Sequence, residues 1–228
     1  MSNVKTQNSN PLRFEINLMK TIIFDFDGTI ADTLPFTWKK VLQYLRKEKL
    51  VADSDEKLIE EIRLKSYHEL MKKFKISWLK FPLIYLEIRK AQKDLYQIIE
   101  TIQLFPGMRD LLKKLKNNNC QVGILSSNIK MTIDKFIKIN DLNYFDFVHC
   151  EKNLFGKDRA LNNLIKKYKL NKEDVIYVAD EVRDIEACQK ANVKIISVTW
   201  GFNKDQVLRA YKPTWLVKNP KEILSILT

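Results

Sequence analysis

Two aspartates follow a short apolar run near the start of the chain. The run Thr21–Phe24 is apolar and β-branched, which is typical of a buried strand. It continues into Asp25 and Asp27, although aspartate is a poor strand former and is rarely buried without a partner. Residues two apart on an extended chain point the same way, so we expect both carboxylates to face one site. A DxDG sequence by itself more often marks a strand end and a turn.

Further polar residues follow later apolar runs in the same way. They come after the runs at 121–125 and 175–179, and Lys157 opens a helical stretch between those runs. The residues concerned are Ser126, Ser127, Asn128, Asp180, Glu181 and Asp184. If the runs are parallel strands, their carboxyl ends meet at one edge of the sheet, where ligands bind in such folds. The pattern therefore predicts that carboxylates, a hydroxyl and an ammonium group converge there.

A set of this composition suits phosphoryl transfer. Clustered carboxylates are hard to keep ionised without a cation, and hard oxygen ligands favour Mg²⁺. One carboxylate can attack phosphorus, while a second protonates the leaving oxygen and later deprotonates water. A hydroxyl and a lysine can hold the phosphoryl oxygens as charge develops. The sequence contains no Walker A motif, so phosphate binding by that loop is not expected.

The same residues show a family resemblance. Asp25-Phe26-Asp27-Gly28-Thr29 with Thr33 behind it, Ser126, Lys157 and Asp180-Glu181-x-x-Asp184 resemble the four motifs of the haloacid dehalogenase superfamily. The resemblance extends from about Lys20 to the end of the chain. Three further segments, Leu104-Phe105-Pro106-Gly107, Asp184-Ile185-Glu186-Ala187 and Val198-Thr199-Trp200-Gly201-Phe202, resemble the phosphoglycolate-phosphatase-like branch, which has a helical cap inserted after the first motif. One departure is Ala179, where the family usually has glycine, and a methyl group should be tolerated there.

The resemblance implies a nucleophile and a metal site. Asp25 would be the nucleophile and a Mg²⁺ ligand. Asp27 would be the general acid and then base, and would also give its backbone carbonyl to the metal. Asp180 and Asp184 would complete the metal site. Because Asp27 is present to protonate a leaving group, the expected substrate is a phosphate ester and not a haloacid.

The resemblance also implies substrate contacts. Ser126 would hydrogen-bond the transferring phosphoryl group, and Lys157 would neutralise the nucleophile and the phosphate. The predicted substrate-binding residues are Gly28, Thr29, Ser127, Asn128 and Lys65. Lys65 belongs to an interhelical break at 63–67, which would face the organic part of the substrate because the cap sets specificity in this family.

The surrounding sequence predicts an α/β fold, a doubly wound parallel sheet with an inserted α-helical cap domain. The predicted strands are 21–24, 121–125, 145–148, 175–179, 193–198 and 215–217. The predicted helices between them are 108–116, 131–139, 158–168, 185–191 and 204–210. The segment 34–104 contains no glycine and repeats its apolar residues at helical spacing, so we expect a cap of three to five helices.

The domain prediction places the catalytic core at 20–33 and 105–228, with the cap at 34–104 between the two parts. Residues 1–19 form a polar, partly disordered extension in this prediction. Within that extension, Phe14, Ile16 and Leu18 alternate with polar neighbours, which is a weak edge-strand signal.

Composition indicates a globular protein of the cytoplasm. Hydrophobic residues make up 45% of the chain, and no apolar run reaches the length of a membrane span. The N-terminus lacks the apolar region of a secretory signal. Three widely spaced cysteines without a CxxC pair suit a reducing compartment. The net charge of +12 is spread along helical stretches, so we expect steering of a phosphorylated substrate and no nucleic-acid partner.

The sequence thus predicts a Mg²⁺-dependent phosphatase that hydrolyses a small phosphorylated metabolite through an aspartyl-phosphate. Within the superfamily the alternatives are a sugar-phosphate mutase and a pyrophosphatase. A phospho-acceptor signalling module is another alternative, but such modules lack a DxDGT sequence on the first strand and a helical insertion behind it. A basic nucleic-acid-binding protein is an alternative that rests on charge alone. The oligomeric state stays open.

Overall fold

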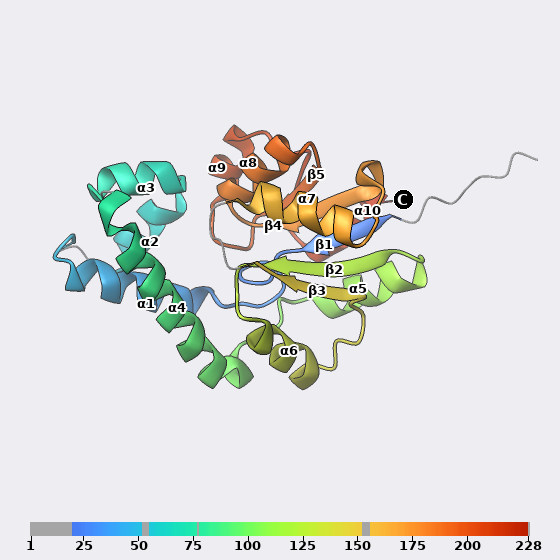
Figure 1. The fold of residues 1–228 in the computed structure, drawn as a ribbon, viewed down its shortest axis with the longest axis horizontal. Coiled ribbons are helices and arrows are strands. Elements are labelled where there is room, and N and C mark those ends of the chain that lie inside the picture. The colour runs from blue at the N-terminus through green and yellow to red at the C-terminus, as the bar shows by residue number, and fades with distance from the viewer. Residues whose placement is uncertain (1–19, 52–54, 77, 152–155, 228) are drawn as a thin grey trace, which may run out of the picture.

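The computed structural model describes residues 20–51, 55–76, 78–151 and 156–227. Figure 1 shows a sheet with helices on both faces and a separate group of helices beside it. The sheet has six strands in the order β3-β2-β1-β4-β5-β6, and every pairing is parallel. The strands are β1 (Thr21–Phe24), β2 (Gln121–Ser126), β3 (Phe147–Cys150), β4 (Val175–Ala179), β5 (Lys194–Val198) and β6 (Trp215–Val217). The predicted doubly wound sheet is confirmed.

The central strand β1 is apolar because both of its faces are buried. Ile22 and Phe24 pack into one hydrophobic cluster, and Ile23 packs into the cluster on the opposite face. The first cluster includes residues of α5 (Met108–Asn117), α6 (Lys130–Ile139) and α10 (Pro220–Leu227). The second includes residues of α7 (Lys157–Lys167), α8 (Val182–Ala191) and α9 (Asp205–Ala210). A strand buried on both faces is apolar throughout, as a parallel sheet requires.

Most predicted strands and helices of the core agree with the structure to within one residue, and two differ by two or three residues for local reasons. The predicted strand 145–148 begins later, at Phe147, because Asp146 bonds the edge of β2 with both its backbone and its side chain. The predicted helix 185–191 begins earlier, at Val182, where the side chain of Asn203 accepts a hydrogen bond from the first helical N–H. The predicted edge strand at Phe14, Ile16 and Leu18 lies outside the described residues.

The inserted segment is helical, as predicted. It contains the helices α1 (Leu34–Lys47), α2 (Asp55–Arg63), α3 (Tyr67–Lys73) and α4 (Phe81–Ile98). Two short 3-10 helices, η1 (Trp78–Lys80) and η2 (Ile99–Thr101), flank α4. A small core is formed by residues of α1 and α2 and by Phe74, which follows α3; its other members are Trp38, Leu42, Leu45, Leu58 and Ile62. Ser66 begins α3 through a capping box with Glu69. Among the helices that the structure describes, none has both the length and the apolarity to cross a membrane.

The two connections between the sheet domain and the helical insertion run side by side. Ala31 and Leu104 form an antiparallel bridge. On either side of it, the N–H of Asp32 donates to the carbonyl of Gln103 at 2.8 Å, and the N–H of Phe105 donates to the carbonyl of Ile30 at 3.0 Å. The chain therefore leaves and re-enters the sheet domain at one paired point.

Candidate active site

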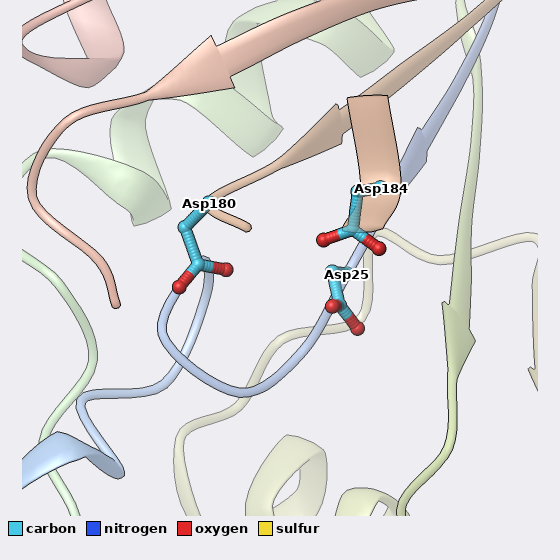
Figure 2. Close-up of side chains that lie close together, drawn as sticks. All are labelled: Asp25, Asp180 and Asp184. Atoms are coloured by element: carbon cyan, nitrogen blue, oxygen red, sulfur yellow. The ribbon is translucent and has the colours of Figure 1, made fainter. Parts of the chain in front are cut away.

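Three buried carboxylates meet at the carboxyl edge of the sheet. Asp25 follows β1, Asp180 follows β4, and Asp184 lies in the first turn of α8. One oxygen from each lies within 4.8 Å of the others (Figure 2). All three side chains are almost completely shielded from solvent. The predicted convergence of carboxylates from separate strands is therefore seen in the structure.

Lys157 places a positive charge in this acidic cluster. It is the first residue of α7, and its Nζ lies 2.7 Å from Asp25 Oδ2 and 2.5 Å from Asp184 Oδ1. Burial lowers the pKa of Lys157, but the charges of Asp184 and Asp25 outweigh burial and hold that pKa well above its usual value. Lys157 therefore stays protonated and offsets part of the negative charge.

Lys157 does not neutralise all three carboxylates, so the cluster can bind a cation as well. Burial raises the pKa of Asp184 to about 6, with Lys157 opposing and Asp25 adding to the rise. Burial also raises the pKa of Asp180 well above its ordinary range, followed by the charges of Glu181 and Asp25. In addition, Asp184 Oδ2 is buried without a hydrogen-bond partner. An all-oxygen set with an unsatisfied carboxylate oxygen fits a hard divalent cation.

Asp180 is held in one orientation by its neighbours. Its Oδ1 accepts a hydrogen bond from Thr29 Oγ1 and its Oδ2 accepts one from the Phe202 N–H, both at 2.7 Å. Gly28 has φ +74°, and a Cβ there would lie 2.3 Å from Asp180 Oδ2. A Cβ on Gly201 would lie 2.1 Å from the Asp180 Cβ. The structure places Gly28 and Thr29 against Asp180, and their predicted contacts with substrate stay predictions.

Asp27 occupies a different environment from the other aspartates. It is half-buried, and Asn128 Nδ2 donates to its two carboxylate oxygens at 3.1 and 2.9 Å. Burial, followed by the charge of Asp25, raises the pKa of Asp27 to about 6, and the Asn128 amide opposes that rise. A carboxyl with such a pKa can exchange protons near neutral pH. Asn128, predicted to bind substrate, is placed here as the partner of Asp27.

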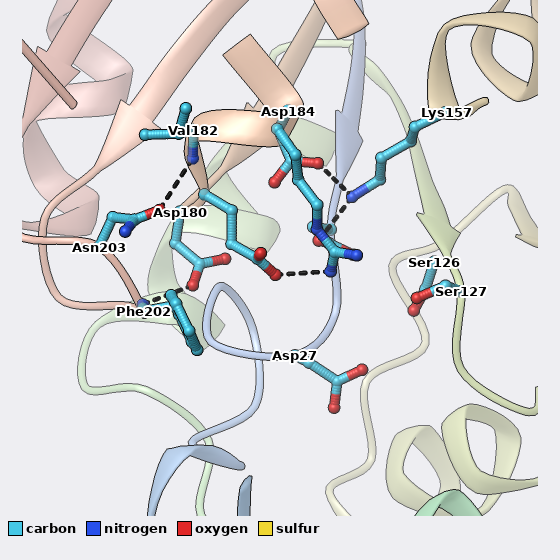
Figure 3. Close-up of polar contacts among 12 residues, drawn as sticks. Asp27, Ser126, Ser127, Lys157, Asp180, Val182, Asp184, Phe202 and Asn203 are labelled. Atoms are coloured by element: carbon cyan, nitrogen blue, oxygen red, sulfur yellow. Dashed lines mark hydrogen bonds and ion pairs between the residues drawn. The ribbon is translucent and has the colours of Figure 1, made fainter. Parts of the chain in front are cut away.

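Ser126, the last residue of β2, and Ser127, which follows it, lie on the Lys157 side of the cluster, while Asp180 lies on the other side (Figure 3). Ser126 is buried, and its Oγ accepts a hydrogen bond from the Asn128 N–H at 3.0 Å. A small pocket opens beside these serines, and its lining residues are Leu125, Ser126, Ser127, Glu151, Lys157, Ala160 and Arg183. Hydroxyl and ammonium groups thus share one cavity next to the carboxylates.

Two polar residues near the site were not predicted from the sequence. Arg183 lines the pocket, and its Nη2 lies 2.6 Å from Glu181 Oε1. Its position directly before Asp184 is the signal that could have identified it. Gln92 comes from α4 of the insertion and donates to the Ser127 carbonyl at 2.9 Å, a contact without local sequence signal. The predicted Lys65 forms an ion pair with Glu61 at 3.8 Å.

Residues 22–198 match the family model described as haloacid dehalogenase-like hydrolase. The chain belongs to this family. A phosphoglycolate phosphatase from Synechococcus elongatus is 34% identical over 212 residues, covering 92% of this chain and 98% of that protein. The pyrophosphatase PpaX of Oceanobacillus iheyensis is 23% identical over 225 residues, covering 92% and 97%. The recognised superfamily, with its phosphoglycolate-phosphatase-like branch, is therefore confirmed.

Solved structures of haloacid dehalogenase-like proteins share the fold. A predicted phosphatase from Clostridium acetobutylicum superposes with a TM-score of 0.75 at 19% identity, covering 92% of this chain and 98% of that chain. A predicted phosphoglycolate phosphatase from Haemophilus somnus gives a TM-score of 0.67 at 19% identity, covering 92% and 99%. At these identities the likeness establishes the fold, and the activity has to be argued from the site.

Proposed function

We propose that this haloacid dehalogenase-like hydrolase is a Mg²⁺-dependent phosphatase that acts on a small phosphorylated metabolite resembling phosphoglycolate. The observation that carries the proposal is the acidic cluster of Asp25, Asp180 and Asp184 beside Lys157. The three carboxylates, with the backbone carbonyl of Asp27, would hold Mg²⁺, and the free Asp184 Oδ2 supports this ligand set. When bound, Mg²⁺ would neutralise charge on the phosphoryl group and orient it.

In the first step, a carboxylate oxygen of Asp25 attacks phosphorus and the bond from phosphorus to the leaving oxygen breaks. Asp27 gives its proton to that oxygen, so the alcohol departs neutral. In the second step, Asp27 takes a proton from water as the water oxygen attacks phosphorus and the bond from phosphorus to the Asp25 oxygen breaks. Inorganic phosphate leaves, and Asp25 and the protonated Asp27 are regenerated. The raised pKa of Asp27 suits both proton transfers.

Ser126 and Lys157 would hold the phosphoryl oxygens during both steps. Because the Ser126 Oγ already accepts from the Asn128 N–H, its own proton can be donated to a phosphoryl oxygen. Lys157 contacts the nucleophile Asp25 directly, and its ammonium group would stabilise the negative charge that develops on the phosphoryl oxygens. The backbone N–H group of Ser127 is a further candidate donor, whereas the N–H of Gly28 already donates to the Ala31 carbonyl at 3.0 Å.

The cap would control access and specificity. We propose residues 34–104 as a unit that moves about the paired connections at Ala31 and Leu104. Such movement excludes water from the reaction. Lys65 stays a proposed contact to the organic group of the substrate. A pyrophosphatase activity is the second candidate, because the Oceanobacillus iheyensis relative carries that name, but the higher identity to a phosphoglycolate phosphatase favours the monoester.

The proposed location is the cytoplasm. Cys120, Cys150 and Cys188 carry free thiols, as is usual for proteins in a reducing compartment. The proposed partner is a small phosphorylated molecule, and the positive net charge would help to attract it.

Removal of the metal tests the function directly. The purified protein is expected to hydrolyse a generic aryl phosphate with millimolar Mg²⁺ and to lose turnover in EDTA, because the carboxylates then repel the phosphate. Release of the aryl alcohol is measured with Mg²⁺, with EDTA, and with Mg²⁺ restored after EDTA. Undiminished hydrolysis after exhaustive chelation would contradict the proposed metal role.

Alanine variants of two glycines, Gly28 and Gly107, distinguish the effect of backbone strain from the effect of displacing Asp180. Gly28 and Gly107 both have positive φ, but a Cβ would lie 2.3 Å from Asp180 Oδ2 at the first and 3.8 Å from Pro220 at the second. Both alanine variants should lose about 1–2 kcal/mol of unfolding free energy through left-handed strain. Only Gly28→Ala should also require a much higher Mg²⁺ concentration for turnover. Denaturant melts and Mg²⁺ titrations of activity check this, and equal Mg²⁺ requirements would refute it.

A further inference from the structure

One loop of the sheet domain, residues 201–204, forms several hydrogen bonds and one aromatic contact with the cap. Arg63, the last residue of α2, donates from Nη2 to the Gly201 carbonyl and from Nε to the Phe202 carbonyl, both at 3.1 Å. The ring of Phe202 stacks on that of Trp38 in α1, with 4.6 Å between ring centroids. The cap is thus docked on this loop through a two-pronged arginine contact and an aromatic pair.

Asn203 adds a second set of bonds at the same place. Its Nδ2 donates to the backbone carbonyls of Arg63 and Lys65 at 3.3 and 3.1 Å. The N–H of Lys204 also donates to the Arg63 carbonyl, at 3.0 Å. Asn203 is almost fully buried, and its Oδ1 accepts from the N–H of Val182, which opens the helix that carries Asp184. The break between α2 and α3 therefore contacts the loop through both side chain and backbone.

The same loop fixes Asp180. The Phe202 N–H donates to Asp180 Oδ2 at 2.7 Å, and the Asn203 N–H donates to the Asp180 carbonyl at 3.3 Å. Figure 3 shows Phe202 and Asn203 beside Asp180, with Asn203 linked to Val182. Two of the three carboxylates in the acidic cluster are thus positioned from these few residues.

A single peptide unit connects the two sets of contacts. The carbonyl of Gly201, which accepts from Arg63, and the N–H of Phe202, which donates to Asp180, belong to the same peptide group. That group is planar and rigid, so fixing its carbonyl also fixes the direction of its N–H. A charged donor on the carbonyl also polarises the group and strengthens the bond that its N–H makes.

We propose that Arg63 is a positioning residue that couples docking of the cap to metal binding at Asp180. This inference rests on the proposed function, because it assumes that Asp180 binds Mg²⁺. Arg63 orients the peptide between Gly201 and Phe202, and that peptide orients the Asp180 carboxylate. Since coupling between two binding events is reciprocal, Mg²⁺ should in turn favour the docked cap.

Mg²⁺ titrations of melting temperature test the coupling without any substrate. Arg63→Ala is compared with wild type and with Lys47→Ala, which removes an exposed ion pair to Glu87 inside the cap. The Arg63→Ala variant should bind Mg²⁺ about 2- to 30-fold more weakly, the range seen for residues that modulate coupling at a distance. The Lys47→Ala control should keep the wild-type affinity.

Arg63→Lys separates geometry from charge. Lysine keeps the charge but cannot hold two carbonyls with a planar fork, so it should restore only part of the lost Mg²⁺ affinity. In turnover assays, Arg63→Ala should raise the Mg²⁺ concentration for half-maximal rate more than it lowers the rate at saturating Mg²⁺. A purely structural role would predict unchanged Mg²⁺ affinity in the folded variant.

Equal Mg²⁺ affinity in wild type, Arg63→Ala and Lys47→Ala would overturn the coupling while leaving the proposed phosphatase intact. Full restoration by Arg63→Lys would overturn the peptide-orientation argument. A wild-type protein whose melting temperature does not respond to Mg²⁺ would instead contradict the proposed function, together with the inference that rests on it.

Discussion

Replacing Asp25 with asparagine is expected to reduce phosphatase turnover by at least about 10⁴-fold. An amide cannot attack phosphorus, and the substitution also removes a carboxylate that contacts Lys157 at 2.7 Å. Asparagine has nearly the same shape, so the fold should survive. Single-turnover and steady-state rates on an aryl phosphate, with a thermal melt to confirm folding, measure the effect.

The matched control is Asp32→Asn. Asp32 lies on the same segment after β1, outside the acidic cluster. That variant should keep turnover close to wild type, because its carboxylate has no place in the proposed reaction. A folded Asp25→Asn variant with more than a few per cent of wild-type turnover would show that another group attacks the phosphoryl substrate.

The second large effect concerns stability and the metal. Mg²⁺ that binds the folded site and hardly the unfolded chain stabilises by about 2.7 kcal/mol at a hundredfold excess over its Kd. For a chain of this size that corresponds to a rise of roughly 5–10 °C in melting temperature. Asp180→Asn removes one ligand and one repelling charge, and its amide can still accept from the Phe202 N–H. The variant should melt at or above wild type in EDTA and gain little from Mg²⁺.

Paired thermal melts in EDTA and in millimolar Mg²⁺ measure this effect. Asp134→Asn is the control, since Asp134 forms an exposed ion pair with Lys130 away from the cluster. The control should show the full Mg²⁺-induced rise. If Asp180→Asn also kept the full rise, Asp180 would not be a ligand and the metal site would have to be redrawn around Asp25 and Asp184.

The sheet and the acidic cluster could be predicted because their signals are local. Each core strand is a short apolar run, and a strand buried on both faces needs such a run. Asp25, Asp180 and Lys157 stand where those runs end or where the next helix begins, so the topology of a parallel sheet brings them together. The motif pattern then added the roles that spacing alone leaves open.

Other features depend on contacts between residues far apart in the sequence. Thr29 and Asn128 donate hydrogen bonds to Asp180 and Asp27, which are 151 and 101 residues away, and their predicted contacts with substrate stay predictions. Hydrogen-bond partners at such separations leave no periodic trace in the sequence. The docking of Arg63 on residues 201–204 is of the same kind. Helix α10, which follows the last predicted strand, was not predicted.

Trapping the phosphorylated enzyme tests the central claim most directly. In Asp27→Asn the base for the second step is absent, while an aryl phosphate with a good leaving group can still phosphorylate Asp25. The variant is mixed with this substrate and Mg²⁺, quenched in acid, digested and analysed by mass spectrometry. The account predicts one phosphoryl group on the peptide that contains Asp25, formed with Mg²⁺ and absent in EDTA. A phosphoryl group on Ser126, or none on Asp25 while the aryl alcohol is released in stoichiometric amount, would contradict it.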